Sequence, residues 1–440
     1  METDRKCTHR AINPPTHITT ESALNCIYSG SRMVGFPVAV VLPAGGSGER
    51  MGLSTPKQFC DFLERPLISF TIEAFERINW IQSIIVVVAK ECIDLMRAII
   101  HKYSHKRITL VTGGQTRHRS IFNGLKVFTD SQVYDYKLTK PEVVIIHDAV
   151  RPFVEEDLLL KIATAAKDHG AAGATRPLVS TVIATTSEGC LDHSLERAKY
   201  RASEMPQAFL FDTIYQAYQQ CSDYDFEYGT ECLQLVLQNC RSKAKLIEGP
   251  PTLWKVTFKR DLFAAESVIK ESLSQKACVI TGVEQDAVQL AHCLEKTFTQ
   301  LKVEVMSTPV GEVSCIQTIS AKEYRNIIYV IVNDTDLQEI KQIVESIGNT
   351  SLPILYPVVL IMVHLNMSES TPFSNNMDEL GAIRLLAKEA KQKNILVYGL
   401  LVNYPKDTEK WNDAVENVCL IAGTLIKDRN VVLAGQLFVA

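Results

Sequence analysis

Short runs of β-branched apolar residues alternate with helical segments from residue 36 onward, and this alternation limits the fold more than any other feature. The runs are apolar throughout, as expected for strands buried on both faces. They lie at residues 38–42, 84–88, 108–111 and 143–146. Segments with helical spacing of apolar residues lie between them, at 67–78, 92–101 and 120–128. This rhythm predicts a mostly parallel α/β sheet with helices on both faces.

The first strand ends in a glycine loop, Pro43-Ala44-Gly45-Gly46-Ser47-Gly48. Glycine reaches backbone angles that are closed to other residues, so such a turn can aim several N–H groups at one anion. Arg50 and Lys57 follow closely and can neutralise a polyphosphate. A glycine turn alone is a weak signal and can be a plain strand-to-helix connection. The added charges favour a phosphate site.

The loop matches neither common phosphate-binding motif. A P-loop needs Lys-Ser/Thr after its last glycine, whereas Gly48 is followed by Glu49-Arg50. A dinucleotide fold expects an acidic residue after the second strand, and that strand ends in Lys90. A third kind of nucleotide site is therefore indicated.

Two further strands also end in polar segments, where ligands of parallel sheets bind. Gly113-Gly114 precede Gln115, Arg117 and Ser120, a pattern that also fits an ordinary turn and helix start. Asp148-Ala149 directly follow the strand at 143–146. A carboxylate at this place suits a divalent cation; it could instead cap the helix that begins near Glu155.

Composition narrows the functional classes. The chain has 440 residues and a net charge of −4, which gives no electrostatic argument for nucleic acid or an anionic membrane. Its twelve cysteines are scattered, which predicts free thiols and a cytoplasmic (cytosolic) location. Residues 1–35 predict a disordered tail without a secretory signal, and the apolar run at 352–367 is too broken to span a bilayer.

Between residues 177 and 203 the pattern changes to alternating and then basic residues, which predicts a β-arm projecting from the sheet. Residues 253–257 predict a strand that carries Lys255 towards the site, followed by a helix at 261–269. Projecting β-arms like the one predicted at 177–203 commonly make dimer contacts.

Six ordered motifs over residues 36–270 resemble the IspD-like cytidylyltransferases, a family that includes methylerythritol-phosphate and ribitol-phosphate enzymes. They are the segments 42–51, 56–58, 113–120, 147–152, 206–207 and 255–257. The resemblance implies a Rossmann-like, GT-A-like nucleotidyltransferase domain, CTP and a polyol phosphate as substrates, Mg²⁺ as cofactor and a homodimer formed through the arm. The two-domain layout is similar to that of ribitol-phosphate enzymes, which implies conversion of D-ribitol 5-phosphate to CDP-ribitol for the O-mannosyl glycans of α-dystroglycan.

The resemblance also implies roles for single residues. Arg50, Lys57 and Lys255 are expected to act on the triphosphate, and Asp148 to hold the metal. Arg151, Thr181 and, from the partner subunit's arm, Arg197 are expected to bind the polyol phosphate. The expected nucleotide-binding residues are Pro43, Ala44, Gly45, Gly46, Ser47, Gly48, Gly114, Gln115, Arg117, Ser120 and Ala149.

Three positions depart from the methylerythritol-phosphate pattern: Ser180 replaces an aspartate, Met205 a threonine and Pro251 an acidic residue. The first two alter the acceptor pocket and disfavour methylerythritol phosphate, which remains the alternative substrate. The third departure removes a second acidic candidate and leaves Asp148 as the expected metal ligand.

A polar link at residues 271–276 leads to a second α/β domain at 277–440, which resembles short-chain dehydrogenases more weakly. Where that family has glycines after Thr-Gly, this chain has Val283-Glu284-Gln285-Asp286, whose charges oppose a pyrophosphate. We expect a degenerate Rossmann-like domain of scaffolding or regulatory role. Two less favoured hypotheses are a bifunctional enzyme with an added sugar-phosphate reductase and a nucleotide-binding protein without catalytic activity.

Overall fold

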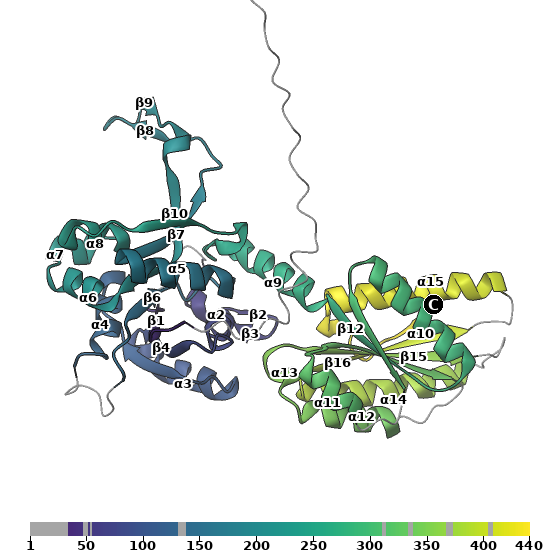
Figure 1. The fold of residues 1–440 in the computed structure, drawn as a ribbon. Coiled ribbons are helices and arrows are strands. Elements are labelled where there is room, and N and C mark those ends of the chain that lie inside the picture. The colour runs from purple at the N-terminus through teal and green to yellow at the C-terminus, as the bar shows by residue number, and fades with distance from the viewer. Residues whose placement is uncertain are drawn as a thin grey trace, which may run out of the picture.

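The computed structural model describes residues 34–46, 52, 55–130, 138–309, 314–332, 338–366, 373–403 and 408–440. These residues form two α/β units, each built on its own sheet (Figure 1). All but the last two residues of the predicted tail at 1–35 lie outside the described part.

The first sheet has seven strands in the order β11-β7-β10-β6-β1-β4-β5. Its strands are β1 (Val38–Pro43), β4 (Ile81–Val88), β5 (Ile108–Thr112), β6 (Val143–Ile146), β7 (Ala171–Pro177), β10 (Arg201–Leu210) and β11 (Lys245–Glu248). Strand β10 runs antiparallel to both its neighbours, and the other pairs are parallel. The prediction of a mostly parallel sheet is confirmed.

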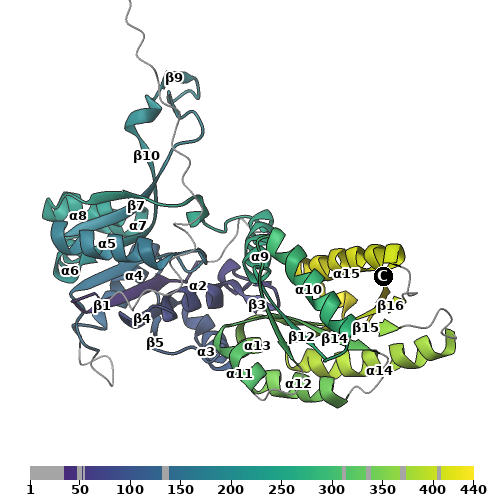
Figure 2. The same cartoon turned by 45° about the vertical axis from the view of Figure 1, so that its right-hand side comes forward.

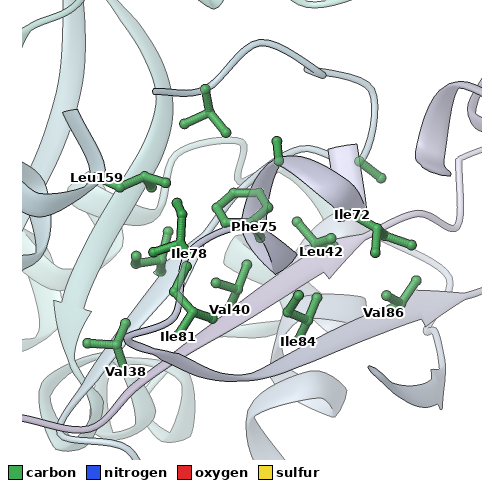
Figure 3. Close-up of a cluster of buried hydrophobic side chains, with 14 of the residues drawn as sticks. Val38, Val40, Leu42, Ile72, Phe75, Ile78, Ile81, Ile84, Val86 and Leu159 are labelled. Atoms are coloured by element: carbon green, nitrogen blue, oxygen red, sulfur yellow. The ribbon is translucent and has the colours of Figure 1, made fainter. Parts of the chain in front are cut away.

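Both faces of this sheet are buried, which explains why its central strands are apolar throughout. In β1, Val38, Val40 and Leu42 face one helical layer, while Ala39 and Val41 face the other. Figure 3 shows the first of these clusters, in which Phe75 packs over β1 and β4. Each fully buried side chain of this size contributes roughly 1.5–3 kcal/mol to the free energy of unfolding.

The first layer consists of α2 (Leu67–Glu76), α3 (Ile93–Lys102) and α5 (Glu156–His169). The second consists of α4 (Arg117–Lys126), α6 (Phe211–Gln219) and α8 (Cys232–Cys240), with α7 (Asp223–Tyr228) beside α4. The short hairpin of β2 (Asp61–Phe62) and β3 (Arg65–Pro66) precedes α2.

A β-arm leaves the sheet between β7 and β10 and ends in the hairpin of β8 (Ile183–Thr185) and β9 (Leu191–Ser194) (Figure 1). The turn η4 (Arg197–Lys199) leads back into β10. Large apolar side chains on the arm are exposed, with Val179 at 80% and Leu191 at 65%.

One sequence-based expectation fails in the segment that leads to the second sheet. The predicted strand at 253–257 is instead the 3₁₀ turn η5 (Pro251–Leu253) followed by extended chain. Among the described residues, one backbone bond, Val256 N–H to Val150 O at 3.1 Å, joins this chain to a distant segment. Within the predicted link at 271–276, α9 (Lys259–Leu273) ends and β12 (Lys276–Thr281) begins.

The second sheet is fully parallel, with the order β13-β12-β14-β15-β16-β17. Its further strands are β13 (Glu304–Pro309), β14 (Asn326–Val332), β15 (Val358–Asn366), β16 (Ile395–Asn403) and β17 (Leu437–Val439). Counted from β12, this order is 2-1-3-4-5-6, whereas dinucleotide-binding folds have the order 3-2-1-4-5-6. The second domain is thus a doubly wound α/β unit, and its likeness to dehydrogenases stays a prediction.

Helices α10 (Gln285–Gln300) and α15 (Thr408–Asp428) cover one face of this sheet. The other face packs against α11 (Ser314–Ala321), α12 (Gln338–Gly348) and α14 (Phe373–Gln392) (Figure 2). Among the helices in the described ranges, none combines the length and the apolar character needed to cross a membrane.

Candidate active site

A cavity of about 360 Å³ lies at the carboxyl ends of β1, β5 and β6, where the three polar loops meet. This is the edge of a parallel sheet at which ligands bind, and the volume is in the range of small-molecule sites. The cavity is lined by Pro43, Ala44, Gly45, Gly46, Lys57, Gln58, Gly114, Gln115, Thr116, Arg117, Ser120, Asp148, Ala149, Val150, Lys255 and Thr257.

Gln58, in the turn η2 (Lys57–Phe59), holds the glycine loop in place through hydrogen bonds. Its side-chain Nε2 donates to Ala44 O at 2.6 Å and to Gly46 O at 3.1 Å, and the residue is only 3% exposed. Ala44 N–H donates to Val87 O of β4 at 2.7 Å. Gln58 therefore connects the turn that carries Lys57 to the glycine loop, and both segments line the cavity.

A second wall is built where β5 passes into α4. Ser120 Oγ accepts from Gly114 N–H at 3.1 Å and lies 3.2 Å from Gly114 O. A Cβ atom on Gly114 would lie 2.5 Å from Arg119 Cβ and 3.2 Å from its carbonyl carbon, so only glycine lets the strand end approach the helix this closely. Thr116 caps α4 by accepting from Arg119 N–H. This part of the cavity lining is therefore formed by small residues, Gly114 and Ser120, held close to each other.

Three cations surround the carboxylate of Asp148. Arg117 Nη2 lies 3.1 Å from Oδ1, while Arg151 Nε at 3.0 Å and Lys255 Nζ at 3.1 Å contact Oδ2. Burial by itself would raise the pKa of Asp148, but Arg117, Lys255 and Arg151 outweigh it and hold the pKa well below its usual range. The carboxylate is therefore ionised at neutral pH, and the cavity carries a net positive field.

Arg117 is supported by a polar network behind the cavity. Its Nη1 donates to Cys232 Sγ at 3.5 Å, and Cys232 lies 3.6 Å from the Tyr218 hydroxyl. Tyr218 in turn bonds to His118 Nδ1 at 2.7 Å. Burial, with the Arg117 charge next in importance, lowers the pKa of His118 to about 4, so this histidine is neutral. The network fixes the Arg117 guanidinium against Asp148.

Arg151 does not line the cavity. It is 8% exposed, and besides Asp148 its guanidinium contacts Glu204 and the carbonyl of Leu253. The arginine thus ties the Asp148 loop to β10 and to η5. Its predicted contact with the polyol phosphate stays a prediction.

The structure brings together twelve of the predicted site residues in this cavity. They are Pro43, Ala44, Gly45, Gly46, Lys57, Gly114, Gln115, Arg117, Ser120, Asp148, Ala149 and Lys255. Ser47, Gly48 and Arg50 lie outside the described residues. Thr181 and Arg197 are exposed on the arm, where Arg197 Nη1 donates to Val179 O at 2.8 Å.

Four lining residues were missed from the sequence: Gln58, Thr116, Val150 and Thr257. Gln58 and Thr257 belong to the motifs 56–58 and 255–257, so the motifs themselves carried the signal. Thr116 and Val150 adjoin predicted site residues, but nothing in their type sets them apart.

The donor set for a metal ion is small. Within the described ranges, no three His, Cys, Asp or Glu side chains are arranged to hold a metal. Asp148 is an ionised carboxylate that lines the cavity. Because Mg²⁺ is usually bound by one or two carboxylates together with substrate phosphates and water, Asp148 fits a magnesium site completed by a nucleotide.

The two halves of the chain match two different protein-family models. Residues 38–271 match the family model for 2-C-methyl-D-erythritol 4-phosphate cytidylyltransferase. Residues 275–419 match the model for the D-ribitol-5-phosphate cytidylyltransferase C-terminal domain.

Two relatives extend over both domains. The chain is 56% identical over 406 residues to human D-ribitol-5-phosphate cytidylyltransferase, covering 92% of this chain and 90% of the relative. It is 56% identical to the Xenopus tropicalis protein of the same name, covering 91% and 97%. The 4-diphosphocytidyl-2C-methyl-D-erythritol synthase structure from Anaerococcus prevotii is 27% identical, with a TM-score of 0.45, covering 54% of this chain and 100% of that one. The identity to the human and Xenopus tropicalis proteins over both domains shows that the chain belongs to the D-ribitol-5-phosphate cytidylyltransferase family.

Proposed function

We propose that the chain transfers the cytidylyl group of CTP to D-ribitol 5-phosphate, giving CDP-ribitol and pyrophosphate. The similarity to D-ribitol-5-phosphate cytidylyltransferases across both domains carries this proposal. The bacterial relatives of the other substrate class match a little over half of the chain, as for the protein from Syntrophus aciditrophicus (53%). The CDP-ribitol formed would supply ribitol phosphate to protein O-mannosyl glycans.

In the reaction, an oxygen of the ribitol phosphate forms a bond to the α-phosphorus of CTP. The bond from that phosphorus to the β-phosphate bridging oxygen breaks, and pyrophosphate leaves with the electron pair. The acceptor phosphate is already an anion near neutral pH, because its second pKa is about 6. The protein needs no nucleophile of its own, and its contribution is positioning and stabilisation of charge.

The cavity supplies both contributions. The wall at Gly114 and Ser120 receives the cytosine ring, and the loop at residues 43–46 offers backbone groups to the phosphates. Lys57 and Lys255 neutralise the charge that develops on the leaving pyrophosphate. Arg50 joins them in this proposal.

Asp148 would hold Mg²⁺, which when bound neutralises phosphate oxygens and orients them for in-line attack. Lys255 and Arg117 are already in contact with the same carboxylate. Entry of a triphosphate gives these cations new anionic partners, which frees Asp148 for the metal.

We further propose a homodimer formed through the β-arm. Val179, Ile183, Leu191 and Tyr200 are exposed there at 80%, 51%, 65% and 44%. Exposed apolar side chains on a projecting arm suit a protein interface. Across such an interface, Thr181 and Arg197 would reach the polyol phosphate.

The test is release of pyrophosphate from CTP with a panel of acceptors. We expect D-ribitol 5-phosphate to give the highest kcat/KM. The comparison with 2-C-methyl-D-erythritol 4-phosphate decides between the two substrates: equal or greater kcat/KM with that acceptor would overturn the substrate assignment. No release with any acceptor would overturn the activity itself.

A further inference from the structure

The two domains meet at a buried polar cluster centred on Tyr356, which directly follows α13 (Leu352–Leu355) of the C-terminal domain. Its hydroxyl donates to Glu73 Oε2 in α2 at 2.8 Å. Arg65 Nη1 donates to the same oxygen at 2.7 Å and, across the junction, lies 3.3 Å from Leu355 O. In both overall views α13 lies beside the β2–β3 hairpin that carries Arg65 (Figure 1, Figure 2).

The ion pair of this cluster is shielded from water, whereas Tyr356 is half-buried and, with Glu73, lines a second cavity. The side chains of Arg65 and Glu73 are 1% and 8% exposed. The Arg65 guanidinium lies 4.3 Å from the ring centre of Phe70 and 5.3 Å from that of Tyr356. A buried ion pair holds its geometry only when its remaining hydrogen-bonding groups are satisfied. Tyr356 is therefore a structural partner of Glu73 and not an incidental contact.

Helix α2 connects this cluster to the cavity. Two residues before Glu73, Thr71 Oγ1 donates to Ala149 O at 2.9 Å, and Ala149 follows Asp148. Any shift of α2 would therefore move the segment that carries the Asp148 carboxylate.

A second connection is apolar. Tyr356 packs against the buried cluster that contains Val150 and Val256. Val150 is two residues after Asp148 in the chain, and Val256 directly follows Lys255. The two segments are joined because Val256 N–H donates to Val150 O at 3.1 Å. Tyr356 thus packs against the same buried cluster that anchors both segments whose side chains form the Asp148–Lys255 pair.

We propose that Tyr356 is a positioning residue, through which the C-terminal domain holds α2 and the Asp148 and Lys255 segments in the arrangement that cytidylyl transfer requires. The inference rests on the site proposed above. It assigns to the C-terminal domain a function that needs no ligand of its own.

The test replaces Tyr356 by Phe in the full chain, which removes the hydroxyl and keeps the ring. The matched control is Tyr398→Phe, because Tyr398 is fully buried within the C-terminal domain and donates to Asn430 O at 3.0 Å. We expect Tyr356→Phe to lower kcat at least about fivefold, with a smaller change in KM for CTP. Tyr398→Phe should lower Tm but keep kcat within about twofold. Equal kcat values for the two variants would overturn the proposal.

A double-mutant cycle separates positioning from general damage. If Tyr356 acts through Glu73, the Glu73→Gln, Tyr356→Phe double variant should be no slower than the slower single variant. Multiplied effects of the two changes would contradict action through Glu73.

Hydrogen exchange can be measured on the unaltered chain with CTP alone, so this test does not depend on whether a variant folds. CTP should protect the cavity segments at 43–46 and 114–120 and also the distant residues 352–358. Protection of the cavity segments without protection of residues 352–358 would overturn the proposed link between Tyr356 and the cavity, but it would still support the nucleotide site. No protection of the cavity segments would overturn the proposed site, and the coupling with it.

Discussion

Asp148 illustrates how single side chains set the chemistry of this cavity. Its carboxylate holds Arg117, Arg151 and Lys255 within 3.1 Å, so the cations are arranged before any nucleotide arrives. Such preorganisation stabilises developing charge without reorganisation during the reaction. Of the three cations, Lys255 is the one with most exposure, 33%, and lines the cavity directly.

Replacing Lys255 by Ala should therefore lower kcat/KM by about 10²–10³, as removal of one preorganised charge-stabilising group does. Folding should be kept, because Asp148 retains two cationic partners. The measurement is pyrophosphate release from CTP and D-ribitol 5-phosphate, with Tm as the check of folding. Lys259→Ala, at an exposed position on α9, is the matched control. A Lys255→Ala enzyme within fivefold of its control would refute the assignment.

His118 makes the free energy of unfolding depend on pH. Its pKa is about 4 in the folded chain because of burial and the nearby Arg117 charge, against an ordinary value of 6.5. The histidine takes up a proton on unfolding, so its contribution is complete above pH 6.5 and is lost as the pH falls towards 4. The contribution to the slope is about 1.4 kcal/mol per pH unit in this window.

Asparagine at position 118 can still reach Tyr218 but does not titrate. His118→Asn should therefore show a shallower loss of the unfolding free energy between pH 6.5 and 4.5, measured by urea denaturation. Identical slopes for the two proteins would show that His118 is not held neutral.

Arg151 and Tyr356 show where reasoning from the sequence stops at the level of residues. The motif 147–152 drew attention to Arg151, yet its partner Glu204 lies on β10 and is invisible to any local pattern. Tyr356 bonds to Glu73 across 283 positions of the chain. Pairs of this kind depend on tertiary packing, which no spacing rule contains.

At the scale of elements, the apolar strands β1, β4, β5 and β6 of the first sheet were predictable and irregular segments were not. Strand β6 has the expected bounds, because its four residues are buried and bordered by polar chain. Residues 253–257 have similar β-branched and aromatic character, but Pro250 and Pro251 precede them and donate no backbone bonds. Residues 245–248 were not predicted as a strand. They form β11 at the sheet edge, where three of the four residues are exposed.

The turn from β5 to α4 is tightly packed at Gly114. A Cβ at Gly114 meets Arg119 Cβ at 2.5 Å, so Gly114→Ala must push the strand end away from α4. We expect KM for CTP to rise at least about tenfold, and the unfolding free energy to fall by about 1–3 kcal/mol.

The control is Gly381→Ala in α14, where the added methyl group meets open space. This change should raise the unfolding free energy by about 0.5–1 kcal/mol and leave KM unchanged. An unchanged KM in Gly114→Ala would show that this wall does not receive the nucleotide.

For the whole molecule, the C-terminal domain is the part that the sequence described least well. A second α/β unit was expected there, but β15, which lies between β14 and β16 in the sheet, was not predicted, and the order of the strands is a tertiary property. The proposed dimer is likewise a property beyond the single chain.

Charged residues on the arm should break that dimer. The double variant Val179→Asp, Leu191→Asp changes two exposed apolar side chains that contribute little to the core of one chain. We expect sedimentation velocity to show a dimer for the unaltered protein and a monomer for the variant. Activity should fall with dissociation, because Arg197 would no longer reach the partner's site. A monomeric protein with full activity would contradict this arrangement.

A crystal structure of the full chain with CTP and Mg²⁺ would show where the nucleotide and the metal bind. We expect cytosine against Gly114 and Ser120, the phosphates between the loop at residues 43–46 and Lys255, and the metal on Asp148. A nucleotide bound elsewhere, or a metal that Asp148 does not contact, would contradict the proposed site.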